Sequence, residues 1–211
     1  MNETTIILKK KPIYSFFKRL VDMLASFILI ILLSWLFLIL GVLVKTTSKG
    51  PILYISERVG KNGKLFKFYK FRSMRVNADK ELDELLAKNE TGGITFKMKD
   101  DPRITKFGKF LRKTSLDELP QLFNVLNGTM SFVGPRPAIP REVDQYNDYQ
   151  RQRLLVKQGL TCIWQCSGRS NTTFDEQIEM DLAYIKKRGF FFDCWIMIKT
   201  FFAVIFGKGA E

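Results

Sequence analysis

The stretch that decides the fold is residues 112–137, Arg112-Lys-Thr-Ser-Leu-Asp117-Glu118-Leu-Pro120-Gln-Leu-Phe-Asn124-Val-Leu-Asn-Gly128-Thr-Met-Ser-Phe-Val133-Gly-Pro-Arg136-Pro137. It places two adjacent carboxylates, Asp117 and Glu118, at the start of a short apolar segment with helical periodicity. Arg112 lies just upstream, and Arg136 stands between two prolines, which favour an extended backbone. Carboxylates that can hold a metal, with guanidinium groups near them, suit phosphate chemistry.

The same carboxylates also have a purely structural interpretation. Ser115-Leu-Asp-Glu118 is a capping box, in which Ser115 is the N-cap and the Glu118 side chain returns to the N-cap backbone. Asp117 in the first turn would favour the helix dipole. The spacing alone therefore leaves helix capping and chemistry open.

The apolar residues of this stretch continue the helical pattern, at Leu116, Leu119, Leu122, Phe123 and Leu126. Asn127-Gly128 ends the predicted helix, because glycine readily takes the left-handed conformation of a C-terminal cap. Pro120, one turn into the segment, is a misfit for a helix that exists only for packing.

The composition indicates an anionic partner and excludes several catalytic classes. The 211 residues carry a net charge of +13, which suits a nucleic acid, an anionic membrane surface or a phosphorylated substrate. A hydrophobic content of 46% is high for a plain nucleic-acid binder. The chain has no histidine, which excludes Ser-His-Asp and Cys-His catalysis and His-ligated zinc or haem. Nucleophilic or acid–base work must fall to carboxylate, Lys, Tyr or Cys.

The three cysteines, Cys162, Cys166 and Cys194, are an odd number, so at least one lies outside any intramolecular disulfide. Cys162 and Cys166 lack the further ligands that a zinc site needs. We interpret all three as reduced, in a chain whose working part faces the cytoplasm.

A long apolar segment, Val21–Val44, follows a basic N-terminus. As a helix its 24 residues would reach ~36 Å, enough to cross the ~30 Å hydrocarbon core of a bilayer. Lysines flank both ends, so the positive-inside rule does not assign one end to the outside. A helix that bends back to its own leaflet satisfies both flanks, and Ser34, near the middle, can bend a helix by bonding to the preceding turn. On these residues alone a span and a re-entrant hairpin are both open.

The remaining chain alternates short predicted elements. We expect strands at 52–55 and 65–72 with a turn at 57–63, an exposed charged helix at 77–89, an amphipathic helix at 105–113 and a polar helix at 146–156. Gly159–Arg169 reads as a loop or strand, and Thr173-Phe-Asp-Glu176 as a capping box that opens a helix through Ile185. The apolar segment 189–206 contains Asp193 and Lys199 and fits a helix lying in a membrane interface.

Four motifs occur in order along the chain: Lys70-Phe-Arg72-Ser-Met74, Arg112 with Ser115–Gly128, Val133-Gly-Pro-Arg136-Pro137, and Gly159 with Trp164-Gln165 and Gly168-Arg169. Together they resemble the bacterial sugar transferases, specifically the small monotopic polyprenyl-phosphate phosphoglycosyl transferases. The resemblance runs from about residue 14 to the C-terminus, and the order of the motifs makes it specific.

The resemblance implies transfer of a sugar 1-phosphate from a UDP-sugar to polyprenyl (undecaprenyl) phosphate, with release of UMP. This reaction initiates a lipid-linked glycan of the exopolysaccharide, capsule or O-antigen type. By match, Asp117 is the nucleophile that forms a covalent phosphosugar intermediate, and Glu118 is the ligand of Mg²⁺. Arg112 and Arg136 would bind phosphate and nucleotide. We expect further substrate contacts from Lys70, Arg72, Gln165, Arg169 and Asp181.

The implied fold is α+β and mostly helical, with interfacial amphipathic helices and a compact cytosolic catalytic domain containing a small β element. Residues 1–47 would form the basic N-terminus and a re-entrant membrane hairpin, and residues 48–211 the catalytic domain. The family's hairpin breaks at a Ser-Pro pair, which here is Ser34-Trp35. Re-entrance is still favoured, because a UDP-sugar enzyme needs its catalytic domain on the cytoplasmic face of the bacterial inner membrane.

A different class of function is a non-enzymatic basic scaffold at a membrane surface, or a nucleic-acid binder. Clustering of the Asp-Glu pair with Arg112, in place of a continuous basic stripe, argues against it, and we expect no nucleic-acid partner. The partners expected are the UDP-sugar, the polyprenyl phosphate and the bilayer, and the resemblance leaves a homodimer open. No residue separates glucose from galactose or an N-acetyl sugar.

Overall fold

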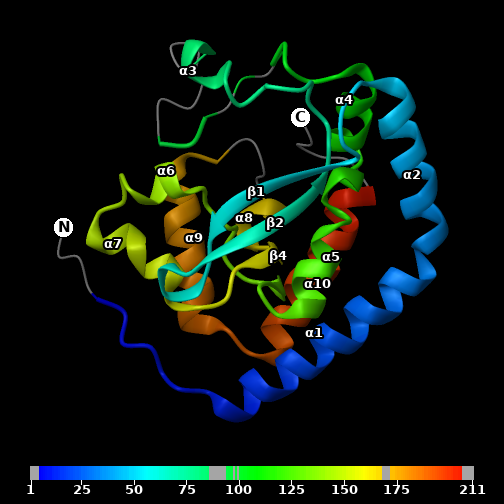
Figure 1. Ribbon diagram of the computed structural model, residues 1–211. Helices are drawn as coiled ribbons and strands as arrows, with labels where there is room; N and C mark the ends of the chain where they lie inside the picture. The colour runs from blue at the N-terminus through cyan, green and yellow to red at the C-terminus, as the bar shows by residue number, and fades with distance from the viewer. Residues whose placement is uncertain (1–4, 86–93, 97, 99, 168–171, 206–211) are drawn as a thin grey trace.

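The computed structural model describes residues 5–85, 94–96, 98, 100–167 and 172–205. These residues are mostly helical with a small amount of sheet, in agreement with the expected α+β class. Two long helices, α1 (Pro12–Leu32) and α2 (Ser34–Thr47), run along the outside of the molecule (Figure 1). A β-hairpin crosses the middle of the same view and carries one part of the site described below.

The long apolar segment bends at Leu33, where its middle was predicted, although no proline is present. The axes of α1 and α2 differ by 64°. Backbone hydrogen bonds continue on both sides of the bend, from Leu33 to Leu29 and from Phe37 to Leu33, each 2.9 Å. Among the described helices none is by itself long and apolar enough to cross a membrane, while α1 and α2 together pass that test of length and composition.

The hairpin consists of β1 (Leu53–Val59) and β2 (Leu65–Phe71), which pair antiparallel around the short 3-10 helix η1 (Lys61–Gly63). Both predicted strands are present. The expected turn at 57–63 is wrong in its first half, because residues 57–59 continue the β1 ladder as far as the pair Val59–Leu65.

The stretch around the two carboxylates is broken into three short elements. They are α4 (Lys106–Lys113), η3 (Leu116–Glu118) and α5 (Gln121–Asn127). Pro120 directly precedes α5, so the predicted continuous helix from 116 to 127 is instead a 3-10 turn followed by an α-helix. Gly128 ends α5 in the left-handed conformation, with φ of 84°, as predicted.

The capping box expected at Ser115–Glu118 is not formed. Ser115 has φ of 57°, in the left-handed region, and its side chain makes no capping hydrogen bond. The Glu118 carboxylate does not return to the N-cap and bonds two cationic side chains instead. Of the two interpretations of this motif, the structure excludes the capping box.

A second, parallel pair of strands holds the loop that carries Arg136. β3 (Ser131–Val133) pairs with β4 (Gly159–Thr161), and the Gly159 amide donates to the Pro135 carbonyl at 2.9 Å. Gly134 and Gly159 lie so close that a Cβ on either would collide with the backbone of the other segment. These two glycines therefore allow the Pro135–Pro137 loop to lie against β4.

Helix α1 is part of the same packed unit. Arg19 donates from both terminal nitrogens to the Val125 and Leu126 carbonyls at the C-terminal end of α5, each at 2.7 Å. Asp22, 4% exposed, accepts from the Phe132 amide of β3 at 3.2 Å. The contacts of α1 thus hold the end of α5 and the start of β3, the two elements on either side of Gly128.

The remaining helices follow the predicted pattern only in part. They are α3 (Leu82–Leu85), α6 (Pro140–Val143), α7 (Asp148–Arg151), the 3-10 helix η4 (Gln152–Leu155), α8 (Ile163–Ser167), α9 (Phe174–Lys187) and α10 (Phe190–Ile205). The helix at Pro140–Val143 was not predicted, and Ile163–Ser167 is helical within Gly159–Arg169, which was expected to be a loop or strand. The Thr173–Glu176 capping box is confirmed at the start of α9. Of the helix expected at 77–89 the structure describes residues 77–85, and among these Leu82–Leu85 are helical.

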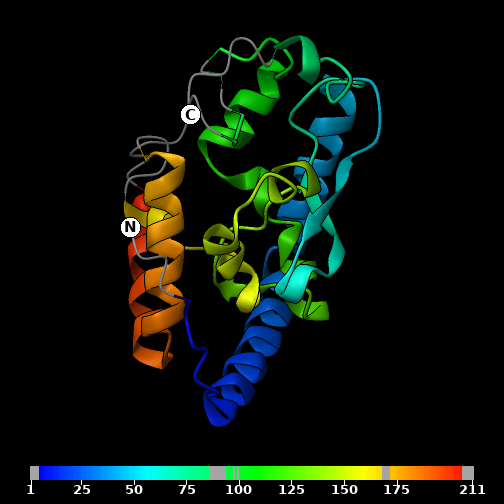
Figure 2. The same cartoon turned by 90° about the vertical axis from the view of Figure 1, so that its left-hand side faces the viewer.

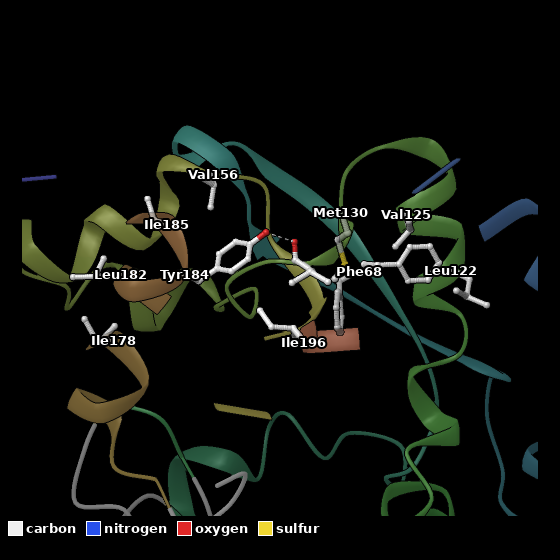
Figure 3. Close-up of a cluster of buried hydrophobic side chains, with 12 residues drawn as sticks. Phe68, Leu122, Val125, Met130, Val156, Ile178, Leu182, Tyr184, Ile185 and Ile196 are labelled. Carbon is white, nitrogen blue, oxygen red and sulfur yellow. Dashed lines mark hydrogen bonds between the residues drawn. The ribbon is translucent and has the colours of Figure 1, made fainter. Parts of the chain in front are cut away.

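The main core joins these layers. Phe68 of β2 contacts a cluster to which α5, β3, α9 and α10 contribute, including Leu122, Met130, Leu182 and Ile196 (Figure 3). The Tyr184 hydroxyl donates to the Val133 carbonyl at 3.0 Å, which fixes α9 on β3. Figure 2 shows α9 and α10 on one side of the molecule and the β1–β2 hairpin with α2 on the other.

Candidate active site

The two adjacent carboxylates meet cations from two other parts of the chain. Lys70 Nζ, from β2, lies 3.0 Å from Glu118 Oε1 and 3.6 Å from Asp117 Oδ2. Arg136 Nη2, from the loop after β3, lies 2.9 Å from the same Glu118 Oε1. The structure therefore brings together Lys70, Asp117, Glu118 and Arg136, four residues that the sequence motifs singled out.

The surroundings separate the protonation behaviour of the two acids. Burial opposes ionisation of Glu118, but the charges and hydrogen bonds of Arg136 and Lys70 outweigh it and lower its pKa to about 2. For Asp117, which is 5% exposed, burial is the largest effect and raises the pKa, with the charge of Lys70 opposing it. Glu118 is thus a fixed negative charge, while Asp117 is a desolvated, more basic carboxylate.

These groups line a cavity of about 1380 Å³, which is large enough for a nucleotide sugar. Arg112 of α4 lines it too, with its Nε donating to Ser73 Oγ at 3.0 Å. No carboxylate lies within ion-pair distance of Arg112 in the described part of the chain, although the charge of Asp117 is close enough to affect its pKa. Arg112 therefore presents a cation at the cavity wall, as expected of a phosphate-binding residue.

Buried Asn124 fixes the strand that carries Lys70. Its amide donates to the Lys67 carbonyl at 2.6 Å, and its Oδ1 accepts from the Tyr69 amide at 3.1 Å. A further strand at this edge of β2 would bind the same two backbone groups. The Asn124 side chain therefore takes the place of a neighbouring strand. Because η3 directly precedes α5, these hydrogen bonds also fix the position of Lys70 relative to η3.

The other predicted substrate contacts differ in their placement. Arg72 lines the cavity, but its Nη2 bonds the Val44 and Ser48 carbonyls and so ties β2 to the end of α2. Gln165, on α8, also lines the cavity. Arg169 lies outside the described residues.

Asp181 is not on the cavity wall. It is 1% exposed, and its Oδ2 accepts from Arg153 Nη2 at 2.6 Å. Burial raises its pKa to about 6, against the opposing charge of Arg153. Since Arg153 also donates to the Arg136 carbonyl at 3.3 Å, Asp181 acts on the site through the backbone of the Pro135–Pro137 loop. This position replaces the expected direct contact between Asp181 and a substrate with a supporting one.

Sequence reasoning missed Arg153 and Arg58. Arg153 was one charge among several in a polar helix, and its ion pair with Asp181 spans 28 residues. Arg58 was assigned to a turn, yet the register pairs it with Phe66 and places it on the Lys70 face of the hairpin. The signal for Arg58 was strand alternation. Extending the predicted strand from residue 55 to residue 58 places Arg58 on a defined face of the hairpin.

The carboxylates also define what metal the site suits. Within the described residues there is no group of three or more His, Cys, Asp or Glu side chains that could hold an ion. Mg²⁺ needs only one or two carboxylates when phosphate oxygens and water complete its shell. Both cationic partners of Glu118 bind its Oε1, so Glu118 is the carboxylate of this site that could hold such an ion.

A model of the family described as "Bacterial sugar transferase" matches residues 13–207. The chain belongs to this family. The match includes the bent helix pair from near its start, the hairpin, the carboxylate pair and α10, so the family assignment covers every element of the site.

Three relatives illustrate the similarity. The galactosyl transferase CpsE of Streptococcus agalactiae serotype III (strain NEM316) is 50% identical over 163 residues, 77% of this chain and 36% of the relative. The undecaprenyl-phosphate galactose phosphotransferase of Salmonella typhimurium is 45% identical over 199 residues, 92% of this chain and 42% of the relative. The exopolysaccharide production protein ExoY of Sinorhizobium fredii is 40% identical over 204 residues, 95% of this chain and 90% of the relative. The chain thus spans less than half of the first two relatives and most of the third.

Proposed function

We propose that the chain transfers a sugar 1-phosphate from a UDP-sugar to undecaprenyl phosphate, releasing UMP and starting a membrane-linked glycan. The observation that carries this proposal is the Asp117–Glu118 pair, of which Asp117 is buried and Glu118 partly buried, beside Lys70, Arg112 and Arg136 in one large cavity. Relatives named for undecaprenyl-phosphate sugar phosphotransfer and exopolysaccharide production support it.

The two carboxylates take different roles in this proposal. An Asp117 oxygen attacks the β-phosphorus of the donor, a bond forms between them, and the bond from that phosphorus to the UMP oxygen breaks. An oxygen of the lipid phosphate then attacks the same phosphorus and displaces the Asp117 carboxylate, leaving a lipid diphosphate sugar. Burial makes Asp117 the more basic acid, and Lys70 offsets negative charge as the two anions approach.

Glu118 would hold Mg²⁺, which when bound neutralises charge on the diphosphate. Arg112 and Arg136 come from opposite sides of η3 in the sequence and would bind phosphate oxygens of the donor. Hydrogen bonds already hold both guanidinium groups, Arg112 to Ser73 and Arg136 to Glu118. Substrate binding therefore needs to order these two side chains little further.

We place the site at the cytoplasmic face of the bacterial inner membrane, with α1 and α2 re-entrant. Large apolar side chains are exposed along both helices and along α10, among them Leu38, Trp35 and Phe191. Exposed apolar side chains of this size favour contact with lipid over contact with water. A bilayer also holds the lipid substrate that the proposed reaction needs.

The covalent step is tested by incubating the enzyme with Mg²⁺ and a UDP-sugar in the absence of lipid. A panel of donors begins with UDP-galactose, since two relatives are named for galactose. We expect UMP release limited to one per enzyme and a phosphosugar adduct on Asp117 by mass spectrometry. Asp117→Asn should lose both, while Asp144→Asn, an exposed aspartate outside the cavity, should keep them. An active Asp117→Asn enzyme would refute the mechanism.

A further inference from the structure

Arg58 of β1 shares a face of the hairpin with Lys70. The register pairs Arg58 with Phe66 and Ser56 with Phe68, so Arg58, Phe68 and Lys70 lie on one face of the hairpin. The guanidinium carbon of Arg58 lies 5.1 Å from the centre of the buried Phe68 ring, and Lys70 Nζ lies 5.6 Å from it. Two cations therefore stand over one ring, and both line the cavity.

The hairpin also holds Arg58 next to the loop of Arg136. The Val59 amide donates to the Ala138 carbonyl at 2.9 Å, which joins the end of β1 to the residue after that loop. Arg58 Nη1 donates to the Pro137 carbonyl at 3.3 Å, a long hydrogen bond. Arg58 and Arg153 thus donate to adjacent carbonyls of the same loop.

Arg58 forms no ion pair in the described part of the chain, where Glu118 pairs with Lys70 and Arg136. The charges of Glu142 and Glu118 act on Arg58 only from beyond ion-pair distance. The Nε of Arg58 is buried and has no hydrogen-bond partner within the described residues. Burial lowers the pKa of Arg58, and the charge of Arg136 lowers it further. A buried N–H without a partner is costly, and the guanidinium has only one long hydrogen bond, so an anion in the cavity would satisfy its charge better.

We propose that Arg58 binds a phosphoryl oxygen of a substrate in the cavity, together with Arg136. The guanidinium fork suits phosphate, and its remaining donors are placed by the Phe68 ring and the Pro137 carbonyl. This inference rests on the proposed function, in which two substrates carry such oxygens, namely the diphosphate of the donor and the monophosphate of the lipid.

The test compares Arg58→Gln and Arg58→Lys in the full chain in lipid nanodiscs. Glutamine is shorter than arginine and has no charge, whereas lysine keeps the charge. The matched control is Arg151→Gln, an exposed arginine that donates to the Tyr146 carbonyl at 3.1 Å and lies outside the cavity. KM is measured separately for the UDP-sugar and for the polyprenyl phosphate, with kcat and the melting temperature of each variant.

Arg58→Gln should raise KM for one of the two substrates by roughly tenfold or more, the loss of one charge-assisted hydrogen bond. The substrate affected identifies whether the oxygen belongs to the donor or to the lipid. Arg58→Lys should recover most of that affinity, and Arg151→Gln should leave both KM values unchanged. If Arg58→Gln changes only the melting temperature or kcat, Arg58 merely connects β1 to the loop and the proposal is overturned.

A direct binding measurement separates this inference from the proposed function. UDP and a short-chain polyprenyl phosphate are titrated in turn onto the wild-type chain and Arg58→Gln, without turnover. Weaker binding of either probe to Arg58→Gln supports the anion contact even if the wild-type chain transfers no phosphosugar. Equal binding of both probes to the two proteins overturns it even if transfer occurs.

Discussion

Replacing Asn124 by leucine should destabilise the chain more than any exposed polar substitution. Asn124 is 0% exposed, and its side chain bonds the Lys67 carbonyl, the Tyr69 amide and Thr129 Oγ1. Leucine has a similar shape but makes none of these bonds. The two backbone groups of β2 then lie at a covered sheet edge with neither a strand nor water to bind them.

The size of the effect follows from those two groups. Each buried backbone group left without a partner costs about 1–3 kcal/mol, so the pair costs about 2–6 kcal/mol. For a chain of this size, each kcal/mol shifts the melting temperature by roughly 2–4 °C, which makes a fall of about 10 °C the central expectation. Because β2 carries Lys70, the same change should loosen the Lys70–Glu118 contact and lower the rate of transfer below the melting temperature.

The assay is thermal unfolding of purified protein in nanodiscs, followed by circular dichroism, with transfer measured at a temperature where both proteins are folded. Asn127→Ala is the matched control. Asn127 Oδ1 also accepts hydrogen bonds from Thr129, from both the backbone amide and the hydroxyl of that residue. Asn127 is exposed, however, so water can replace its side chain. We expect a change within about 0.5–1 kcal/mol there. Equal melting temperatures for Asn124→Leu and Asn127→Ala would refute the reasoning that Asn124 replaces a strand.

Three further predictions follow from single contacts. Ser115 has φ of 57°, so Ser115→Val should lower the free energy of unfolding by about 1–3 kcal/mol, whereas Ser115→Gly should leave it unchanged or raise it. Chemical denaturation measures both variants, and equal effects would contradict the left-handed conformation of Ser115. Arg19→Met should cost about 1–3 kcal/mol through its two bonds to the end of α5, with exposed Lys10→Met as the control; the idea fails if both variants melt together. UMP release should fall on acidification, with a midpoint above the ordinary aspartate pKa of about 3.9, because burial raises the pKa of Asp117 and only its ionised form attacks. Glu118, with a pKa of about 2, stays charged over this range. A rate of UMP release that stays constant down to pH ~3.9 would exclude Asp117 as the titrating nucleophile.

Local patterns in the sequence predicted much of the secondary structure. The Thr173–Glu176 capping box formed because both of its hydrogen bonds lie within four residues. The same spacing at Ser115–Glu118 failed, because Lys70 and Arg136 bind Glu118 more strongly than a backbone amide would. A local rule holds where no charged partner from elsewhere in the chain competes for the side chain.

The sequence by itself indicated the Asp117–Glu118 pair as the candidate reactive group, the place where a bend in the long apolar segment would fall and the two strands of the hairpin. These depend on residue type and on contacts between neighbours along the chain. Only the tertiary structure decided which side chains surround the carboxylates. Lys70 reaches Glu118 across 48 residues, Arg153 reaches Asp181 across 28, and the register of β1 places Arg58 beside Phe68. Such pairs depend on the packing of whole elements, and the pKa difference between Asp117 and Glu118 follows from the burial and charge that this packing creates.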